Sequence, residues 1–591
     1  MPKRLPPSSS GPSANPLLVR GQALRLTEAF LTLPSPSRIE KKALSEALEA
    51  LNDRATICQV LVKELVQAPT DERRNRLGEI LMAVGSVKLL QDPLWELIMS
   101  PTASDTLKDT AHLILRQLGD ETDPNLFLEY LEDPEALIGN ETARMLAQAQ
   151  TNPEAMVDFV DFVLSLPVGE QLSLLQSLAN EYPVAHQARL WEALWAYQPD
   201  NRVAEWLEKT LLEGDDISLA PVLERLGEVE HPNHTTQAFA REARKRHLKW
   251  GATAATRVPH PITQTTTLDT GYATLPDGMG NQAFLVTRRH ANGDICLMAV
   301  ALHQTQGILD CFGFYQLSDA EVGQLVKKFH TTTLQVPLPP SDIAAWLHEA
   351  QKRTTAQQRP LPYEFTLWQA LLDDVTPTPH WPDPLHKTGA CFVTTAWQPI
   401  THQLYLHPDF DTWFLEERDS ELAAWLCEQT LHVTGQALSK AANATPNQSD
   451  SLVKELVSTL ETLGEAFLPA FWASDDRHLL ADKLLRAAYL LNHAQAQTFS
   501  KLAYSEVAQL QQPAETPIET PFLRAYIRRS IAECLLRVVR YPQQHPWLQS
   551  PAGEAIRPQL SVLQTWTDIV YSQWFPTPDE GDPDVSPLFQ A

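Results

Sequence analysis

The chain has 591 residues, a hydrophobic content of 43% and a formal net charge of −26 at pH 7. Single hydrophobic cores stop growing at about 250–300 residues, so a chain of this length is expected to form about two to four domains. The acidic charge argues against nucleic-acid binding over the whole surface, because affinity for phosphate backbones comes largely from Lys and Arg.

The cysteines and the N-terminus bear on the cellular compartment. The six cysteines are scattered without a CxxC pair, which argues against a disulfide framework or a zinc site and favours a reducing compartment. Residues 1–22 are rich in Pro, Ser and Gly, so we expect a disordered tail without a secretion signal. No apolar stretch approaches the ~20 residues of a membrane span. We therefore expect a cytoplasmic protein with no membrane span.

An Asx-Pro dipeptide recurs at near-constant spacing in the front part of the chain. Asp92-Pro93, Asp123-Pro124, Asn152-Pro153 and then Pro183 follow one another at intervals of 31, 29 and 30 residues. Asx-Pro is typical of a helix start, because the Asx oxygen caps a free N–H group and Pro at the first position loses no bond. Helices that begin about every 30 residues predict a stacked array of helical hairpins.

Apolar stripes at helical spacing support the same repeat. They begin at Leu107, Ile138 and Val168, each 14 or 15 residues after a proline of the Asx-Pro series. With these starts and stripes the segment resembles the HEAT-like class of α-helical repeat proteins, most clearly over residues 90–185. The resemblance implies a curved scaffold with an inner surface for partners, and it implies no chemistry. We assign residues 23–250 to this repeat domain.

Basic residues gather at two places in the helical parts of the chain. One cluster closes the repeat domain, and the other lies in a helix predicted near residues 522–539. Each suits a solvated helix face, and the first also suits the negative end of a helix dipole. If a charged partner binds the repeat domain, the candidate contact residues are Arg241, Arg244, Lys245 and Lys249. The second cluster comprises Arg524, Arg528, Arg529, Arg537 and Arg540.

The chain changes character after the repeat domain. Residues 251–267 are rich in Thr and Pro and are expected to link to a small α+β domain at residues 268–410. Strands are predicted at 283–289 and 295–302. Between them, Asn292-Gly293 suits the two positive-φ positions of a type I′ turn, which predicts an antiparallel hairpin.

More elements are expected in the same domain. A third strand is predicted at 308–316, and Ser318 with Glu321 forms the capping box of a following helix. Two further strands are expected at 390–395 and 403–406, after a segment rich in Pro and Trp.

Three groups of residues in this part of the chain suggest chemistry, and each has a plainer interpretation. Gly278 to Ala283 match the dinucleotide pattern GxGxxA, but a strand follows where a helix is needed, so a glycine-rich turn is favoured. His303 and Cys311 resemble a nucleophile pair, but an aromatic strand surrounds the cysteine, which favours a buried and inert thiol. A polar loop is favoured over a metal site for the third group, which comprises His380, Asp383, His386, His402, His407, Asp409 and Asp411.

Helical patterns return in residues 411–575, which are assigned to a C-terminal helical domain, and residues 576–591 are expected to be unstructured. The sequence thus predicts a mainly α protein: a HEAT-like α-solenoid, a small central α+β domain and a C-terminal helical domain. We expect a non-enzymatic scaffold or adaptor that binds a protein partner through the helical-repeat surface.

Two other functions remain open. One is an enzyme or small-ligand binder that uses the α+β domain, and the other is a nucleic-acid binder that uses the cluster from Arg241 to Lys249. The sequence assigns no catalytic residue, no cofactor and no metal ligand, and it does not identify a small-molecule ligand.

Overall fold

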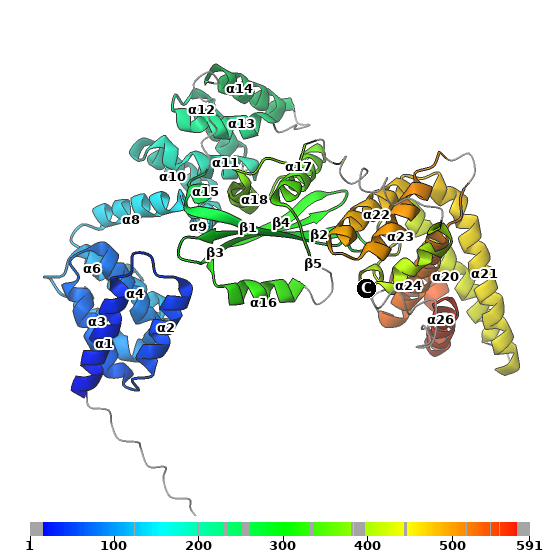
Figure 1. The fold of residues 1–591 in the computed structure, drawn as a ribbon, viewed down its shortest axis with the longest axis horizontal. Coiled ribbons are helices and arrows are strands. Elements are labelled where there is room, and N and C mark those ends of the chain that lie inside the picture. Colours follow the sequence, from blue (N-terminus) through cyan, green and yellow to red (C-terminus); the bar gives the residue numbers. More distant parts are fainter. Residues whose placement is uncertain are drawn as a thin grey trace, which may run out of the picture.

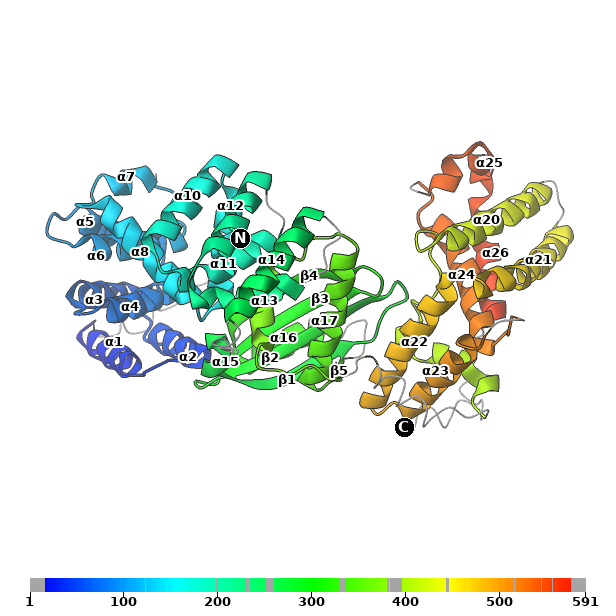
Figure 2. The same cartoon turned by 90° about the horizontal axis from the view of Figure 1, so that it is seen from above.

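The computed structural model describes residues 16–122, 124–197, 200–228, 234–250, 260–329, 335–379, 382, 396–442, 446–513, 517–543, 545–554 and 556–575. A run of helices comes first, a five-stranded antiparallel sheet lies in the centre, and a second helical region follows (Figures 1 and 2). This arrangement confirms the predicted mainly α fold with a small α+β part between two helical parts.

The N-terminal helical run contains many helices in sequence order. They are α1 (Pro16–Leu31), α2 (Arg38–Glu49), α3 (Arg54–Gln67), α4 (Asp71–Val84), α5 (Val87–Ile98), α6 (Asp105–Gln117), α7 (Pro124–Leu128), α8 (Pro134–Ala149), α9 (Pro153–Ser165), α10 (Val168–Glu181), α11 (Ala188–Ala196), α12 (Asn201–Glu213), α13 (Ala220–Glu228) and α14 (His234–Trp250).

These helices pack in two alternating layers. In the first part, α1, α3 and α5 follow one another in one layer, and α2, α4 and α6 follow one another in the other. The later helices repeat this order, with α9, α11 and α13 in one layer and α10, α12 and α14 in the other. Leu61, Leu77 and Leu90 are buried between the layers of the first part, and Leu175 and Leu207 are buried in the second. The packing is compatible with a helical repeat.

The proposed helix starts are only partly correct. Pro153 begins α9, and the side-chain oxygen of its cap Asn152 accepts from two backbone N–H groups. Pro124 begins α7, although Asp123 lies outside the described residues. Pro93 instead lies inside α5, where Ser86 is the cap, and Pro183 precedes a short 3₁₀ turn. An Asx-Pro dipeptide alone therefore does not mark a helix start, because proline is also found within the helix α5.

The first helix begins earlier than the sequence suggests. The helix α1 starts at Pro16, within the tail predicted to be disordered over residues 1–22, and its apolar face buries Val19 and Ala23. Residues 1–15 and the predicted tail at 576–591 lie outside the described residues.

The central sheet is antiparallel throughout and has the order β4-β3-β2-β1-β5. The predicted hairpin is confirmed, but its turn differs from type I′. The described residues with positive φ include Gly293, at 89°, and not Asn292. The His290 amide donates to the Asp294 carbonyl, so three residues separate this hydrogen-bonded pair, where a type I′ turn has two. The strands are β1 (Thr266–Thr274), β2 (Asn281–His290), β3 (Ile295–His303), β4 (Gly307–Leu317) and β5 (Gln335–Pro337).

Helices cover both faces of the sheet (Figure 1). Helices α17 (Pro340–Ala356) and α18 (Tyr363–Trp368) pack on one face, and α16 (Asp319–Phe329) lies on the other. The predicted capping box of α16 is present, since Ser318 and Glu321 exchange hydrogen bonds.

Two predictions at the edges of this domain need correction. The segment 251–267 is not all linker, because α15 (Pro261–Thr265) and the start of β1 lie in it; residues 251–259 are outside the described ranges. The strand predicted at 403–406 is wrong. These residues belong to a 3₁₀ segment, Gln398–Leu406, in which Thr401 and Leu404 are buried three residues apart. The strand predicted at 390–395 lies outside the described residues.

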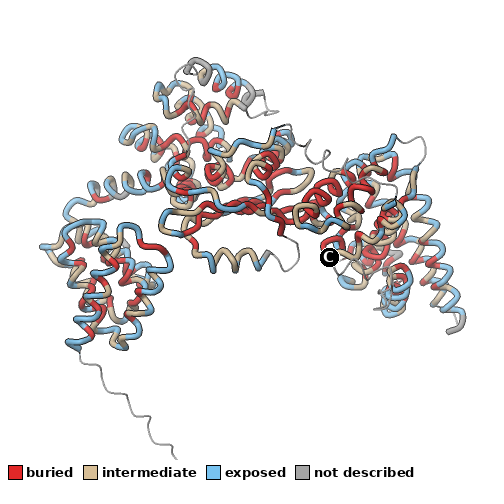
Figure 3. Tube along the Cα trace, viewed as in Figure 1, coloured by how far each residue is buried: buried red, intermediate tan, exposed pale blue. Residues whose placement is uncertain are grey.

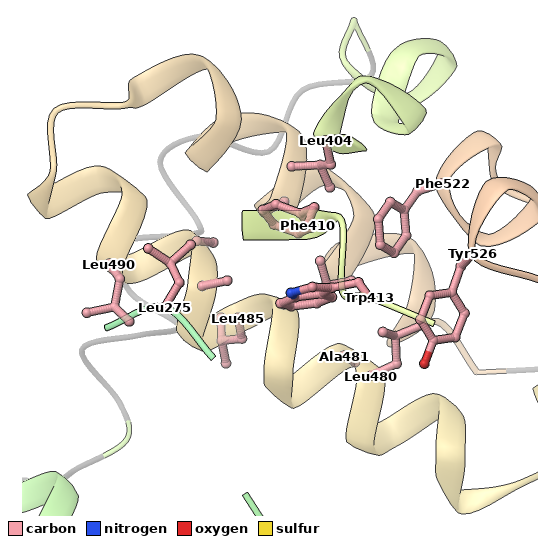
Figure 4. Packing of buried hydrophobic residues seen from close by; sticks show 14 of the residues in the cluster. Leu275, Leu404, Phe410, Trp413, Leu480, Ala481, Leu485, Leu490, Phe522 and Tyr526 are labelled. Atoms are coloured by element: carbon pink, nitrogen blue, oxygen red, sulfur yellow. The ribbon is translucent and has the colours of Figure 1, made fainter. Parts of the chain in front are cut away.

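The C-terminal helical region shares one continuous apolar core with the sheet. Figure 3 marks the buried positions of both regions in red. Trp413 lies among Leu480 and Leu485 of α22 and Phe522 and Tyr526 of α24 (Figure 4). The helices are α20 (Glu421–Ala441), α21 (Pro446–Trp472), α22 (Asp475–His493), α23 (Gln497–Leu510), α24 (Pro521–Arg540), α25 (Pro551–Glu554) and α26 (Leu560–Trp574).

A disulfide joins two of these helices. Cys427 of α20 and Cys534 of α24 are bonded, with 5.9 Å between their Cα atoms and 107 residues between them in the chain. The scattered spacing predicts no disulfide, and that prediction is wrong for this pair. Packing of α20 on α24 brings the cysteines together, and such long-range contact leaves no trace in local spacing. Cys58, Cys296 and Cys311 are free and buried.

Among the described helices, none combines the length and the apolar character that crossing a membrane requires.

Candidate functional site

A groove of about 880 Å³ lies in the C-terminal helical region, between α24, α26 and residues 411–414. Two of its walls are helical stripes. Side chains on α24 are spaced by four, three and four residues, and those on α26 and its C-cap residue Phe575 by three, one and three, so each set follows one helix face. The lining residues are Asp411, Thr412, Phe414, Arg529, Glu533, Leu536, Arg540, Asp568, Tyr571, Ser572 and Phe575.

Arg529 is held firmly on one side of the groove. Its guanidinium lies 4.9 Å from the ring centre of Tyr571 and 5.4 Å from that of Phe575. Its Nε is 3.3 Å from a carboxylate oxygen of Glu533, and an Nη donates to the backbone carbonyl of Asp411 at 3.2 Å. The charge of Arg529 is therefore matched by Glu533 and its planar face is covered by aromatic rings.

Burial governs the protonation of the two groups beside Arg529. Burial raises the pKa of the Glu533 carboxyl, and the guanidinium groups of Arg529, Arg540 and Arg537 oppose that rise without cancelling it. Burial likewise raises the pKa of the Tyr571 phenol. The charge match in this wall comes from the ion pair of Arg529 with Glu533.

The remaining charged groups of the groove are exposed. Asp411, Asp568 and Arg540 are solvent-accessible, and none of their side chains has an ion pair or hydrogen bond with another described residue. Phe414, Leu536 and Phe575 are half-buried and supply apolar surface between them. The arrangement suits a ligand that combines charged and apolar parts.

The sheet positions the wall at residues 411–414. The amide of Gly278 donates to Thr412 Oγ1 at 3.0 Å, and the Trp413 indole donates to the Pro276 carbonyl at 3.2 Å. Lys483 of α22 donates to the Gly278 carbonyl and lies 4.6 Å from the Trp413 ring centre. Burial lowers the pKa of Lys483 to about 8.

Glycine is required where this loop docks. A Cβ atom on Gly278 would lie 1.5 Å from the Thr412 carbonyl oxygen, which no side chain tolerates. The glycines of the GxGxxA pattern therefore lie in the turn between β1 and β2, as its context predicts, and Gly278 packs against the C-terminal helical region.

The predicted partner-binding residues lie elsewhere. Arg241, Arg244 and Lys245 are exposed on α14, and Lys245 forms an ion pair with Glu242. The side chain of Lys249 is outside the described residues. The structure brings these residues together on one helix, and the prediction that a partner binds there stays a prediction.

The second basic cluster is divided between the groove and other contacts. Arg529 and Arg540 line the groove. Arg524 and Arg528 instead pair with Glu519 and Glu461, and Arg537 pairs with Glu416. The sequence indicates the two groove arginines as part of a basic cluster, but not that they form a wall.

Among the described residues, Asp411 is the only one of the potential metal ligands named from the sequence that lines the groove. His407 and Asp409 lie close together, with Nδ1 3.7 Å from a carboxylate oxygen, and His402 is on the 3₁₀ segment. No set of three or more metal-ligating side chains comes together in the described ranges.

The His303 and Cys311 pair is not arranged for catalysis. Cys311 is buried, and burial together with the nearby carboxylates Glu364 and Asp310 raises the pKa of its thiol well above the ordinary value. His303 Nδ1 instead accepts from the backbone amides of Thr305 and Gln306 in the turn after β3.

The aromatic wall was not predicted from the sequence. Asp568 and Tyr571 lie one turn apart on α26, and Phe575 follows four residues later, just beyond the end of the helix. That spacing is visible in the sequence, but it does not show which other helix the stripe faces.

Comparison of the chain with known protein families, curated proteins and solved structures finds no match.

Proposed function

We propose that this protein is a non-enzymatic scaffold or adaptor, and that its N-terminal helical run is a HEAT-like array that binds a protein partner. The observation that carries the proposal is the alternation of layers, with α1, α3 and α5 on one side and α2, α4 and α6 on the other. Stacked helical pairs bury a continuous core and present long surfaces on both sides, which suits binding to another protein.

The distribution of exposed apolar side chains favours the same proposal. Of the eighteen large apolar residues that are exposed among the described ones, twelve lie between Leu17 and Ile217. That segment makes up less than half of the described chain, so the exposed apolar surface is concentrated there. Where such side chains adjoin in one contiguous patch, they mark a site of protein–protein contact.

The helical run is also held against the sheet, as a scaffold requires. Arg189 of α11 pairs with Asp373 at 2.7 Å, and the Glu154 carboxylate of α9 accepts from the Tyr315 amide of β4 at 2.8 Å. These contacts are made by buried or half-buried side chains, and they join α9 and α11 to the sheet domain.

The proposal is tested with two sets of surface substitutions in the full chain. Leu18→Gln with Val66→Gln alters the layer of α1 and α3, and Ile39→Gln with Leu113→Gln alters the layer of α2 and α6; all four side chains are exposed. The partner is captured from extracts of the source cell and rebound in purified form by calorimetry.

We expect one set to abolish binding and the other to leave it unchanged. Tyr541→Gln, at an exposed position in the C-terminal region, is the matched control. If both sets and the control bind the purified partner like the wild type, the helical run is not the binding surface. A protein partner and a cytoplasmic location remain part of this proposal, but the cysteines no longer support the location, because Cys427 and Cys534 are bonded.

A further inference from the structure

We propose that the groove between α24 and α26 binds an extended basic segment of a partner protein, in which cationic and apolar side chains alternate. The inference rests on the proposed adaptor function and adds a second binding site to it, with a defined ligand chemistry. The groove is formed from residues that no catalytic or metal chemistry described above uses.

The length of the groove suits a short extended peptide. Arg529 and Arg540 lie on the same stripe of α24 and are eleven residues apart. At about 1.5 Å per helical residue this stripe is about 16 Å long, which corresponds to about five residues of extended chain. A volume of about 880 Å³ is large enough for several side chains of such a segment.

The charges of the groove favour a basic ligand. Glu533 is matched by Arg529, whose guanidinium is also stacked on Tyr571 and bonded to a backbone carbonyl. The exposed carboxylates Asp411 and Asp568 then outnumber the one exposed guanidinium, that of Arg540. The net charge of −26 acts in the same direction, because it steers cationic segments toward the protein.

The apolar side chains of the groove are the reason why we expect apolar side chains to alternate with cationic ones in the ligand. Phe414, Leu536 and Phe575 line the same groove as the two carboxylates. In an extended peptide, neighbouring side chains point in opposite directions, so one set can contact the carboxylates while the other contacts the apolar wall. The guanidinium of Arg540 repels a cationic ligand. Removing its charge should therefore strengthen the binding of a basic peptide and weaken that of an acidic one.

The experiment uses the purified full chain and two labelled pentapeptides. In one, lysine alternates with leucine, and in the other glutamate replaces lysine. Binding is measured by fluorescence anisotropy at two salt concentrations. The variants Asp411→Asn and Asp568→Asn remove the exposed carboxylates, and Arg540→Gln removes the exposed guanidinium. Glu428→Gln, an exposed carboxylate on α20 outside the groove, is the matched control.

We expect the lysine peptide to bind and the glutamate peptide not to bind. Each Asn variant should weaken binding by about threefold, and both together by about tenfold, as expected for solvent-exposed charge pairs. Arg540→Gln should strengthen binding by about twofold to threefold, Glu428→Gln should leave it unchanged, and higher salt should weaken it.

Three results would overturn the inference. The first is stronger binding of the glutamate peptide that Arg540→Gln weakens, which would show an anion site. The second is displacement of the lysine peptide by millimolar free leucine, which would show a site for a small zwitterion. The third is no binding of either peptide, or binding that none of the three groove variants changes. If the purified partner still needs the N-terminal layers in any of these cases, the adaptor proposal stands without the groove.

Discussion

The backbone amide of Arg38 donates to the carboxylate of Asp294 at 2.9 Å, although 256 residues separate them in the chain. Arg38 is the first residue of α2, and Asp294 lies in the loop between β2 and β3. A carboxylate at a helix N-terminus satisfies a free N–H group and complements the positive end of the helix dipole. The guanidinium of Arg38 also pairs with Glu321 of α16 at 2.8 Å. The first helices are thus joined to the sheet at this point.

Replacing Asp294 should loosen this joint. In Asp294→Ala the amide of Arg38 loses its acceptor at a site where the aspartate is 2% exposed. We expect the free energy of unfolding to fall by about 1.5–3 kcal/mol, the usual cost of a lost hydrogen bond to a charged group. Asp319→Ala is the control, because Asp319 is largely exposed in its pair with Arg289, and it should change stability by less than about 0.5 kcal/mol. Equal urea midpoints for both variants would contradict the prediction.

A methyl group at Gly278 should separate the sheet from the C-terminal helical region. The added Cβ would lie 1.5 Å from the Thr412 carbonyl oxygen, so the loop must move away and lose its bonds to Thr412 and Lys483. We expect Gly278→Ala to destabilise the protein by about 2–4 kcal/mol, the range of strained or overpacked sites.

Gly323→Ala provides the control for this substitution. Gly323 lies inside α16, and no atom comes within 4 Å of the position that the alanine methyl group would take. Alanine in a helix interior is favoured over glycine by up to about 1 kcal/mol, so this variant should be as stable as the wild type or more so. Thermal unfolding of both variants gives the comparison, and a stable Gly278→Ala would show that the loop does not dock as described.

Local signals in the sequence predicted the elements well. The cap at Asn152, the box of Ser318 with Glu321, and the hairpin around Gly293 each depend on residues fewer than ten positions apart. Whether the cap, the capping box and the hairpin turn form therefore hardly depends on the rest of the fold. The same rule misplaced the helix start at Pro93, because the helix already begins at Val87, six residues earlier.

The groove and its supports depend on contacts between distant parts of the chain. Arg529 meets Tyr571 and the carbonyl of Asp411, which are 42 and 118 residues away along the chain. The two stripes on α24 and α26 were present in the sequence, but helical spacing shows only that a face is shared. Which faces meet is decided by packing in the core that α24 and α26 share, and that packing has no local signature.

Loss of the disulfide should weaken the C-terminal helical region. The bond closes a loop of 107 residues between Cys427 and Cys534. A crosslink that closes a loop of this length restricts the unfolded chain, and removing it typically costs about 2–4 kcal/mol of stability. We expect Cys427→Ser with Cys534→Ser to unfold at lower urea concentration than the wild type.

Reduction of the wild type should reproduce that shift. A thiol reductant breaks the bond in the wild type and has no bond to break in the double variant, so the two should then unfold alike. Cys58→Ser, which replaces a free and buried cysteine, is the control that reductant should affect as it affects the wild type. A wild type whose urea midpoint does not respond to reductant would contradict the prediction.

Glu506 should make stability depend on pH. It is fully buried on α23, and burial raises the pKa of its carboxyl to about 7, while hydrogen bonds from Thr520 and Thr401 oppose the rise. Because the folded pKa lies above the unfolded value of 4.5, the folded protein binds the proton more tightly. The stability from this group is full below pH 4.5 and is lost as the pH rises to about 7, a loss of about 3 kcal/mol.

Glu506→Gln should remove this loss. The amide keeps the size of the side chain and an oxygen that accepts from Thr520, but it never carries the buried charge. We therefore expect the variant to be more stable than the wild type by about 2–3 kcal/mol at pH 8 and equally stable near pH 4.5. Urea unfolding across this range measures the difference, with Glu428→Gln as the exposed control on α20. A constant difference between variant and wild type at all pH values would show that Glu506 does not titrate in this window, because only a group that changes charge there can change the slope of stability with pH.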